Sequence, residues 1–183
     1  VTEISDFNSQ FDLLFNQLNL LGMKVLSAIA VILGKKSSFF DSWVLKGNSV
    51  LRLIHYPPIE DSSNILRARA HEDINLITLL VGAEESGLEV QNPEGDWIPI
   101  EAKSKSIVCN IGDMMQLVTR SQLKSTSHRV IDHNAGSSAS RYSMPFFLHP
   151  SPEIELCSIV DDSSESISAH DFLEERLRAI KLY

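Results

Sequence analysis

The first third of the chain carries its apolar residues at intervals of three and four positions. They are Phe7, Phe11, Leu14, Phe15, Leu18, Leu21, Val25, Ile29, Ile32 and Leu33. Because an α-helix turns once every 3.6 residues or so, this spacing gathers them into one stripe along a helix. We therefore predict a helix over residues 6–33, ended by Gly34. A stripe of this kind normally covers a sheet.

From residue 49 the pattern changes to a period of two, which is typical of strands. Val50 to Tyr56 reads as the first strand, and Pro57 and Pro58 close it because proline cannot continue a hydrogen-bonded ladder. Turn-forming sequences separate further predicted strands over residues 74–81, 87–91, 97–100, 106–110, 114–118, 128–132 and 140–149. Many short strands with closely spaced turns favour an antiparallel sandwich or barrel, and a double-sheet jelly roll belongs to this set.

The chain ends in a second predicted helix, over about residues 168–181, whose apolar side includes Phe172, Leu173 and Leu177. A chain of 183 residues is long enough to bury a sizeable core. The expected fold is therefore mainly β with flanking helices. It would form a single domain over residues 1–183, with the jelly roll at about residues 49–150.

Composition narrows the choice of partners. The net charge is −8, the acidic residues are scattered, and no Lys- or Arg-rich stripe is present, which argues against a nucleic-acid partner. The longest near-apolar run near the start, Val25 to Leu33, is far shorter than the roughly 20 residues of a membrane helix. Cys109 and Cys157 are too few for a disulfide framework, so we expect reduced, buried thiols in a cytoplasmic protein.

The most informative residues are His71, Asp73 and His128. On a strand, residues i and i+2 point to one face, so His71 and Asp73 would project together while Glu72 points away. His128 opens a later predicted strand and would complete the set from across the sheet. Two imidazoles and one carboxylate on one face of a metal leave open positions opposite, which oxygen activation at non-haem Fe(II) requires.

Arg141 and Ser143 obey the same i, i+2 rule and follow His128 along the chain. A guanidinium can bind a carboxylate through two parallel hydrogen bonds, and a neighbouring hydroxyl can add a third. The alternative is an arginine that forms a salt bridge at a strand edge. The His71, Asp73 and His128 pattern upstream favours the binding of a carboxylate-bearing ligand.

From about Val25 to its end, the chain resembles the C-terminal catalytic part of the isopenicillin N synthase-like family of Fe(II)/2-oxoglutarate-dependent dioxygenases, in its bacterial branch. The stretches that carry the resemblance are 51–58 (LRLIHYPP), 70–80 (AHEDINLITLL), 87–91 (GLEVQ), 110–113 (NIGD), 127–130 (SHRV), 140–150 (SRYSMPFFLHP) and 172–178 (FLEERLR). Glu72, between the histidine and the aspartate, suits the bacterial branch; many other members have Thr or Ser there.

The resemblance implies a double-stranded β-helix with iron at one open end. By the same resemblance, His71, Asp73 and His128 would be the iron ligands, and Arg141 with Ser143 would hold the distal carboxylate of 2-oxoglutarate.

Tyr56 falls where many members have the tyrosine of an Asn-x-Tyr-Pro motif, which helps to hold the cosubstrate; Ile54 replaces the asparagine here. Family members also carry an N-terminal region before the long helix, and we find no counterpart in this chain. The stripe of Phe7, Phe11 and Phe15 is therefore expected to be left open and to mediate self-association, or to leave the substrate pocket exposed to water.

The function that the resemblance implies is an Fe(II)- and 2-oxoglutarate-dependent oxygenase. Such an enzyme uses O2 to oxidise a C–H bond of a small molecule while it converts 2-oxoglutarate to succinate. One alternative is an oxidase of the isopenicillin N synthase type, in which Arg141 and Ser143 bind the carboxylate of the substrate itself. A second is a non-catalytic jelly-roll module with zinc in the same ligands. Formation of succinate coupled to O2 uptake separates the first hypothesis from both others.

Overall fold

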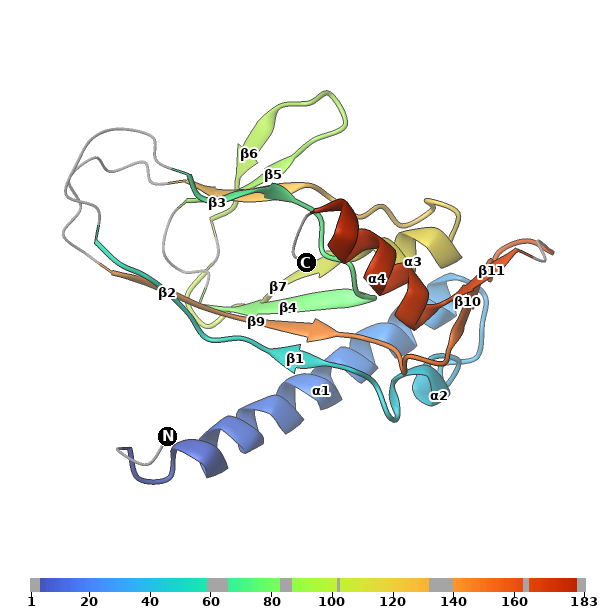
Figure 1. Ribbon diagram of the computed structural model, residues 1–183, viewed down its shortest axis with the longest axis horizontal. Coiled ribbons are helices and arrows are strands. Elements are labelled where there is room, and N and C mark those ends of the chain that lie inside the picture. The colour runs from blue at the N-terminus through green and yellow to red at the C-terminus, as the bar shows by residue number, and fades with distance from the viewer. Residues whose placement is uncertain are drawn as a thin grey trace.

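Two antiparallel sheets face each other in this protein, and a long helix lies along the outer side of one of them (Figure 1). The structure is a computed structural model, and it describes residues 4–58, 66–82, 87–101, 103–131, 140–162 and 165–180. The prediction of a mainly β jelly roll, that is a double-stranded β-helix, is confirmed.

The larger sheet has the order β1-β9-β4-β7 in the described part of the chain, and β2 also pairs with β9. Its strands are β1 (Val50–Leu51), β2 (Ile54–Tyr56), β4 (Ile77–Val81), β7 (Val108–Ile111) and β9 (Arg141–Leu148). The facing sheet has the order β3-β8-β5-β6 and consists of β3 (Leu66–His71), β5 (Leu88–Gln91), β6 (Trp97–Pro99) and β8 (His128–Ile131). Every pairing within the two sheets is antiparallel.

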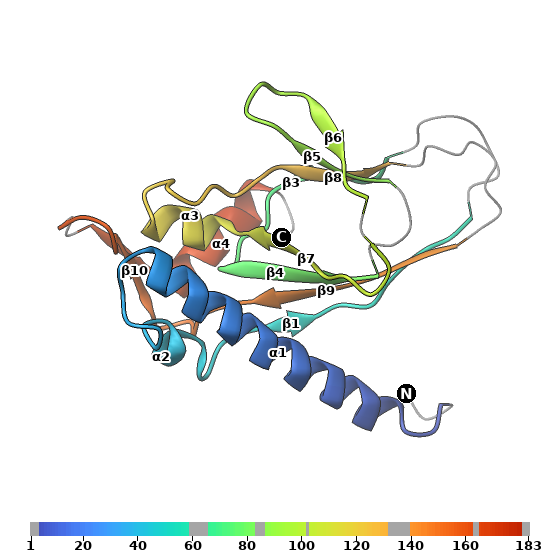
Figure 2. The ribbon, with the colours of Figure 1, turned by 180° about the vertical axis from the view of Figure 1, so that it is seen from behind.

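Helix α1 (Phe7–Ile32) packs on the outer face of the larger sheet, as the view from behind shows (Figure 2). The ring of Phe15 meets the edge of Phe146 on β9, with ring centroids 5.1 Å apart. Gly22 is buried where the helix meets Leu148 of β9, and a Cβ atom at its position would lie 2.8 Å from Leu148 Cδ2. The glycine therefore lets the helix approach the sheet closely, at some cost in helix propensity.

Most of the apolar stripe of α1 is covered, which corrects the expectation from the sequence that it is left open. Phe11 and Phe15 pack against the core, and Leu18 is fully buried in it. Leu21 and Ile32 of the predicted stripe stay exposed, as do Leu13, Leu20 and Val31 outside it. Self-association through α1 stays a prediction, and it would have to use these residues.

By length and composition alone α1 could cross a membrane, and it is the one described helix of which this is true. A helix that covers a sheet satisfies the same criterion, and α1 contacts both β4 and β9. The absence of a membrane partner also stays a prediction.

The first predicted strand, residues 50–56, is divided into β1 and β2. Both segments pair with β9 in one register, Leu51 with Phe146 and Ile54 with Ser143. The interruption lies opposite Pro145, whose carbonyl accepts from the Arg52 N–H at 3.0 Å but which has no N–H to return. The proline therefore explains the gap in the ladder.

The strand predicted over residues 114–118 is wrong, because this segment is helix α3 (Asp113–Val118). Met114, Met115 and Val118 are all buried, which is a helical spacing, and the extended residue Gly112 precedes the first turn. A short apolar run does not separate strand from helix by its periodicity. The two methionines are consequently both core residues.

Strand β3 was missing from the list of predicted strands, although His71 and Asp73 were expected to share a strand; β3 ends at His71, so only the histidine lies on it. The register moves from Leu66–Ile131 to Ala68–Val130 and then to His71–His128, with an irregularity at each step. These irregularities lie in the pairing and not in the sequence, because residues 66–71 (LRARAH) alternate between apolar and polar. Three further short elements were also not predicted from the sequence: α2 (Asp41–Val44), β10 (Glu155–Cys157) and β11 (Ser166–Ser168).

The remaining predicted elements are present with shifted ends. Strands β5, β6, β8 and β9 end within one residue of their predicted bounds, whereas β4 and β7 begin later than predicted; residue 132 lies outside the described residues. Cys109 and Cys157 are free thiols as expected, but Cys109 is exposed and not buried.

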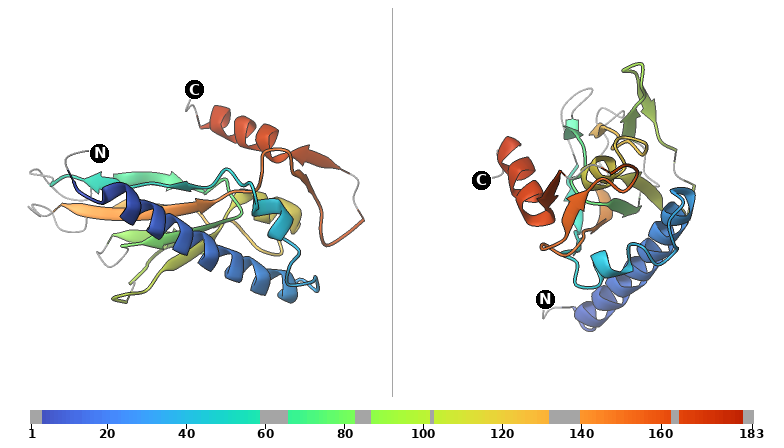
Figure 3. Two further views of the ribbon diagram at one scale, coloured as in Figure 1. Left: turned by 90° about the horizontal axis from the view of Figure 1, so that it is seen from below. Right: turned by 90° about the vertical axis from the view of Figure 1, so that its right-hand side faces the viewer.

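Helix α4 (Ala169–Ala179) closes the described chain and lies against the end of the jelly roll that carries α3 (Figure 3). Ser168 caps it, because the Ser168 hydroxyl accepts from the Asp171 N–H at 3.0 Å. Arg176 reaches from α4 to the first residue of α3, and its Nη2 lies 2.8 Å from Oδ2 of the buried Asp113. This ion pair joins the C-terminal helix to the core.

We predict that Arg176→Gln lowers the free energy of unfolding by about 1–2 kcal/mol, because it leaves the buried carboxylate of Asp113 without its charged partner. Arg178→Gln is the matched control: its partner is Glu174, one turn away, and the Arg178 side chain is 71% exposed, so its loss should cost a few tenths of a kcal/mol. Urea denaturation of both variants measures the difference. Equal losses would show that the Arg176–Asp113 pair adds nothing to stability.

Candidate metal centre

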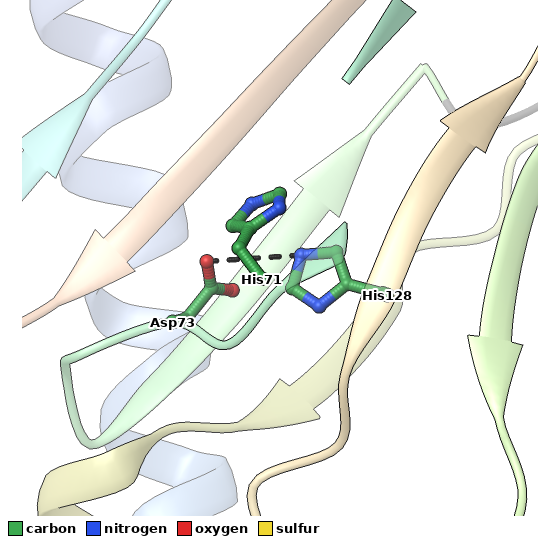
Figure 4. A group of neighbouring side chains, drawn as sticks. All are labelled: His71, Asp73 and His128. Atoms are coloured by element: carbon green, nitrogen blue, oxygen red, sulfur yellow. Dashed lines mark ion pairs between the residues drawn. The ribbon is translucent and has the colours of Figure 1, made fainter. Parts of the chain in front are cut away.

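Three potential metal ligands converge at one end of the space between the sheets. One ligand atom from each of His71, Asp73 and His128 lies within 4.8 Å of the other two (Figure 4). His71 ends β3 and His128 begins β8, and the two residues are direct partners in the antiparallel register. Asp73 lies two residues beyond the end of β3, in the connection to β4, and is buried. The residues predicted from the sequence are therefore brought together.

Each of the two histidines is held in place through its own Nδ1 atom. His71 Nδ1 lies 2.7 Å from the Arg69 carbonyl oxygen, and His128 Nδ1 lies 3.2 Å from the Thr126 carbonyl oxygen. A carbonyl oxygen can only accept, so each Nδ1 carries the proton and donates it. Each Nε2 therefore keeps its lone pair for a metal, as in many metal sites whose second ring nitrogen is anchored by the protein.

The Asp73 carboxylate is oriented by two hydrogen bonds to one oxygen. The Thr78 hydroxyl donates to Asp73 Oδ2 at 2.6 Å, and the Asn110 amide donates to the same atom at 2.7 Å. Asn75 in turn donates to the Thr78 hydroxyl at 2.8 Å, which fixes the direction of its proton. The other oxygen, Oδ1, faces His128 Nε2 at 3.8 Å. One carboxylate oxygen is thus committed to the protein and the other is turned toward the histidines.

The main chain of the 73–76 segment is held by the start of α3. The Asp113 N–H donates to the Asp73 carbonyl at 2.7 Å, and the Gly112 N–H donates to the Leu76 carbonyl at 3.0 Å. A Cβ atom on Gly112 would meet the Asn75 carbonyl oxygen at 2.1 Å, so the two segments approach as closely as a glycine permits. These contacts explain why β4 begins only at Ile77.

A cavity of about 250 Å³ extends from the three ligands between the two sheets. Its walls are formed by alternate residues of the facing strands, among them Thr78 and Leu80 of β4, and Leu88 and Val90 of β5. Alternation of this kind marks the inner faces of the jelly roll. The lining is mostly apolar, with polar groups at the metal ligands and at a few further positions.

Arg141 and Ser143 both line this cavity from β9 and are almost fully buried. Tyr56 is the register partner of Arg141 and also lines the cavity. The Arg141 guanidinium carbon lies 5.3 Å from the centroid of the Tyr56 ring, which is cation–π range. Ile54, which replaces the asparagine of the family motif, is the register partner of Ser143 and contributes an apolar side chain to the same wall.

Three polar residues that hold Asp73 were not singled out from the sequence: Asn75, Thr78 and Asn110. Thr78 and Asn110 are register partners on β4 and β7. Each is a polar residue within a largely apolar strand, which was the signal available to find them. Asn75 is fully buried in a connection, and nothing in the sequence pattern marks it.

Of the other histidines, His149 is the one with a distinctive environment. Burial lowers the pKa of His149 to about 4, although the Asp73 carboxylate works in the opposite direction. His149 is therefore neutral at physiological pH. His55 stacks on Tyr142 with ring centroids 4.8 Å apart, His170 is exposed on α4, and His133 lies outside the described residues.

We predict that the protein binds one Fe(II) per chain and that Asp73→Ala or His71→Ala removes most of this binding. Glu72→Ala is the matched control, because Glu72 is an exposed neighbour that the three-residue cluster does not include. Anaerobic equilibrium dialysis measures the bound metal. Loss of iron in Glu72→Ala with retention in Asp73→Ala would overturn the ligand assignment.

We also predict that Thr78→Val weakens Fe(II) binding by about 10-fold, because Asp73 Oδ2 loses one of its two donors. Thr119→Val is a control of equal size at a buried hydroxyl that bonds the Met115 carbonyl and touches no metal ligand. Both variants should lose stability, and only the first should lose metal affinity. Equal iron affinity in the two variants would show that Thr78 does not position Asp73.

Comparison with known proteins agrees with this geometry. A sequence profile of the 2OG-Fe(II) oxygenase superfamily matches residues 47–150. A 2-oxoglutarate-dependent dioxygenase of Didymella fabae is 30% identical over 185 residues, which cover 94% of this chain and 55% of that protein.

Solved structures give the same result. A 2OG-Fe(II) oxygenase family protein from Caulobacter crescentus is 45% identical, with a TM-score of 0.88 over 97% of this chain and 61% of that one. A Neurospora crassa protein in complex with alpha-KG and 5-formyluracil is 30% identical, with a TM-score of 0.90 over 98% of this chain and 62% of that one. The chain thus spans little more than half the length of these relatives, and the superfamily profile matches more than half of the chain. It belongs to the 2OG-Fe(II) oxygenase superfamily.

Proposed function

We propose that this protein is an Fe(II)- and 2-oxoglutarate-dependent dioxygenase that oxidises a C–H bond of a small molecule. The observation that carries the proposal is the convergence of two Nε2 atoms and one carboxylate oxygen on a cavity that also contains Arg141 and Ser143. Its relatives include proteins named 2-oxoglutarate-dependent dioxygenases, and the superfamily to which it belongs uses Fe(II), 2-oxoglutarate and O2.

His71, Asp73 and His128 would hold the iron. Two neutral imidazoles and one carboxylate suit Fe(II) and leave part of its coordination sphere to other ligands. When bound, the iron would supply the activation of O2 and the oxidation of the substrate, coupled to the decarboxylation of 2-oxoglutarate to succinate. The protein contributes orientation: the Nδ1 anchors of the histidines and the donors to Asp73 Oδ2 fix three ligand atoms before the metal arrives.

Arg141 and Ser143 would bind the distal carboxylate of 2-oxoglutarate. A buried guanidinium offers paired donors to a carboxylate, and low local polarity strengthens these hydrogen bonds. The Tyr56 ring packs against the guanidinium and limits its directions. Apolar side chains that line the cavity, among them Leu80, Leu88 and Val130, would exclude water from the cosubstrate.

Two other functions remain as alternatives with their own expected results. In an oxidase of the isopenicillin N synthase type, Arg141 and Ser143 would bind the substrate carboxylate, and O2 would be consumed without succinate. In a zinc-binding module, the same ligands would bind a metal without O2 uptake. The Arg141–Ser143 pair on the cavity wall favours the dioxygenase over the zinc module, because a structural zinc site has no use for it.

The partner would be a small molecule, since the cavity between the sheets has a volume of about 250 Å³ and the Neurospora crassa relative is described in complex with thymine and with 5-formyluracil. We further propose a cytoplasmic location, which the two free thiols support. The assignment to a bacterial branch of the family rests on Glu72 and stays a prediction.

We predict that Arg141→Gln weakens 2-oxoglutarate binding to the Fe(II) protein about 30-fold or more, because a charge-assisted, two-pronged contact contributes about 2 kcal/mol or more. Ser143→Ala should weaken it less, since one neutral hydrogen bond is lost. Anaerobic calorimetry measures both affinities, and an oxygen electrode with a succinate assay measures coupling. An unchanged 2-oxoglutarate affinity in both variants, or O2 uptake without succinate, would favour the oxidase.

A further inference from the structure

Besides Arg141, two further arginines line the cavity. Arg67 donates to the carbonyl oxygens of Tyr56 and Pro57, whereas Arg52 lies on the same wall as Tyr56 but farther from Arg141. Arg52, in the interruption between β1 and β2, occupies alternate positions with Ile54 and Tyr56 of β2, and all three line the cavity. Tyr56 is paired with Arg141, whereas the Arg52 main chain is bonded to Pro145. Four residues of extended chain span about 13 Å, so Arg52 and the Tyr56–Arg141 pair mark two separate places along the wall.

The register of β9 with β4 shows which of these places lies at the metal ligands. Phe147 is the partner of Thr78, whose hydroxyl bonds Asp73. The guanidinium carbon of Arg52 lies 5.6 Å from the centroid of the Phe147 ring. Phe147 is therefore level with Thr78 along the sheet. Arg52 lies opposite Pro145, two residues before Phe147, and its guanidinium reaches the Phe147 ring, whereas Arg141 lies six residues from Phe147 along β9.

This arrangement divides the cavity. A 2-oxoglutarate molecule that reached from the metal ligands to Arg141 would occupy the Tyr56 end and leave the Phe147 end to a second molecule. That end has one apolar ring and one cation. Arg52 is exposed, and among the described residues its side chain makes no ion pair or hydrogen bond; its contact is with the Phe147 ring. Asp73 is the one carboxylate among the described residues that line the cavity.

We infer that Arg52 binds a carboxylate of the small-molecule substrate, which would lie with its apolar part against Phe147. The inference rests on the proposed function and adds the chemical class of the substrate. A single guanidinium matches a carboxylate through two parallel hydrogen bonds, and its flat face stays packed on the ring while its edge binds the anion. The substrate is thus an organic acid oriented by its charged end, with its C–H bonds directed toward the metal ligands.

The test compares acids with their uncharged counterparts. Benzoate, cyclohexanecarboxylate, hexanoate and indole-3-acetate are each paired with the corresponding primary amide, which has the same shape without the charge. Each compound is titrated by anaerobic calorimetry into the Fe(II) protein saturated with 2-oxoglutarate. We expect at least one acid to bind about 10-fold or more tightly than its amide, because a charge-assisted contact replaces a neutral one.

The same titrations on Arg52→Gln should abolish the preference for the acid and leave 2-oxoglutarate affinity within about two-fold of the original. Arg52→Lys should keep part of the preference, since it keeps the charge and loses the paired donors. Arg178→Gln removes the same charge from exposed α4 and should change nothing.

The outcomes are separable. If no acid binds more tightly than its amide, or if the preference survives in Arg52→Gln, Arg52 is a surface arginine packed on Phe147 and the inference is overturned while the proposed function stands. If 2-oxoglutarate itself does not bind to the Fe(II) protein, the proposed function fails first.

Discussion

The position of one carboxylate, that of Asp73, is the constraint on which the rest of this structure depends. It lies beyond the end of β3, where no ladder would hold it, and it is buried. An isolated buried carboxylate is costly, so its partners must be supplied by other elements. Thr78 of β4 and Asn110 of β7 bond one of its oxygens, and the start of α3 bonds its main chain. Helix α4 in turn bonds α3 through the Arg176–Asp113 pair.

The two sheets contribute different parts of the site. The smaller sheet brings the two histidines side by side through the pairing of β3 with β8. The larger sheet supplies the donors to Asp73 and, farther along β9, Arg141. Because each inner face carries every second residue, the polar groups stand at intervals among apolar ones along the cavity. The distance between Arg52 and Arg141 along one wall follows from this alternation and gives the cavity two ends with different chemistry.

Much of the fold and the site was predictable from the sequence where a regular period was present. The helix stripe of α1 and the alternation of β9 indicated the correct element types, and the i, i+2 rule placed Arg141 and Ser143 on one wall. The prediction failed where the period was broken or too short. Pro145 divided the first strand, and a six-residue run with two methionines formed a helix, whereas β3 was overlooked although its residues 66–71 alternate. The donors to Asp73 were missed because their role depends on the pairing of β4 with β7, which no local pattern reveals.

The most direct test of this account is an anaerobic titration of the purified protein, first with Fe(II) and then with 2-oxoglutarate, followed by visible absorption. Chelation of iron by the keto acid produces a charge-transfer band that neither component gives alone. The account predicts that the band appears and saturates at one Fe(II) and one 2-oxoglutarate per chain, and that Asp73→Ala does not form it. Saturation of the iron site without any such band on addition of 2-oxoglutarate would contradict it.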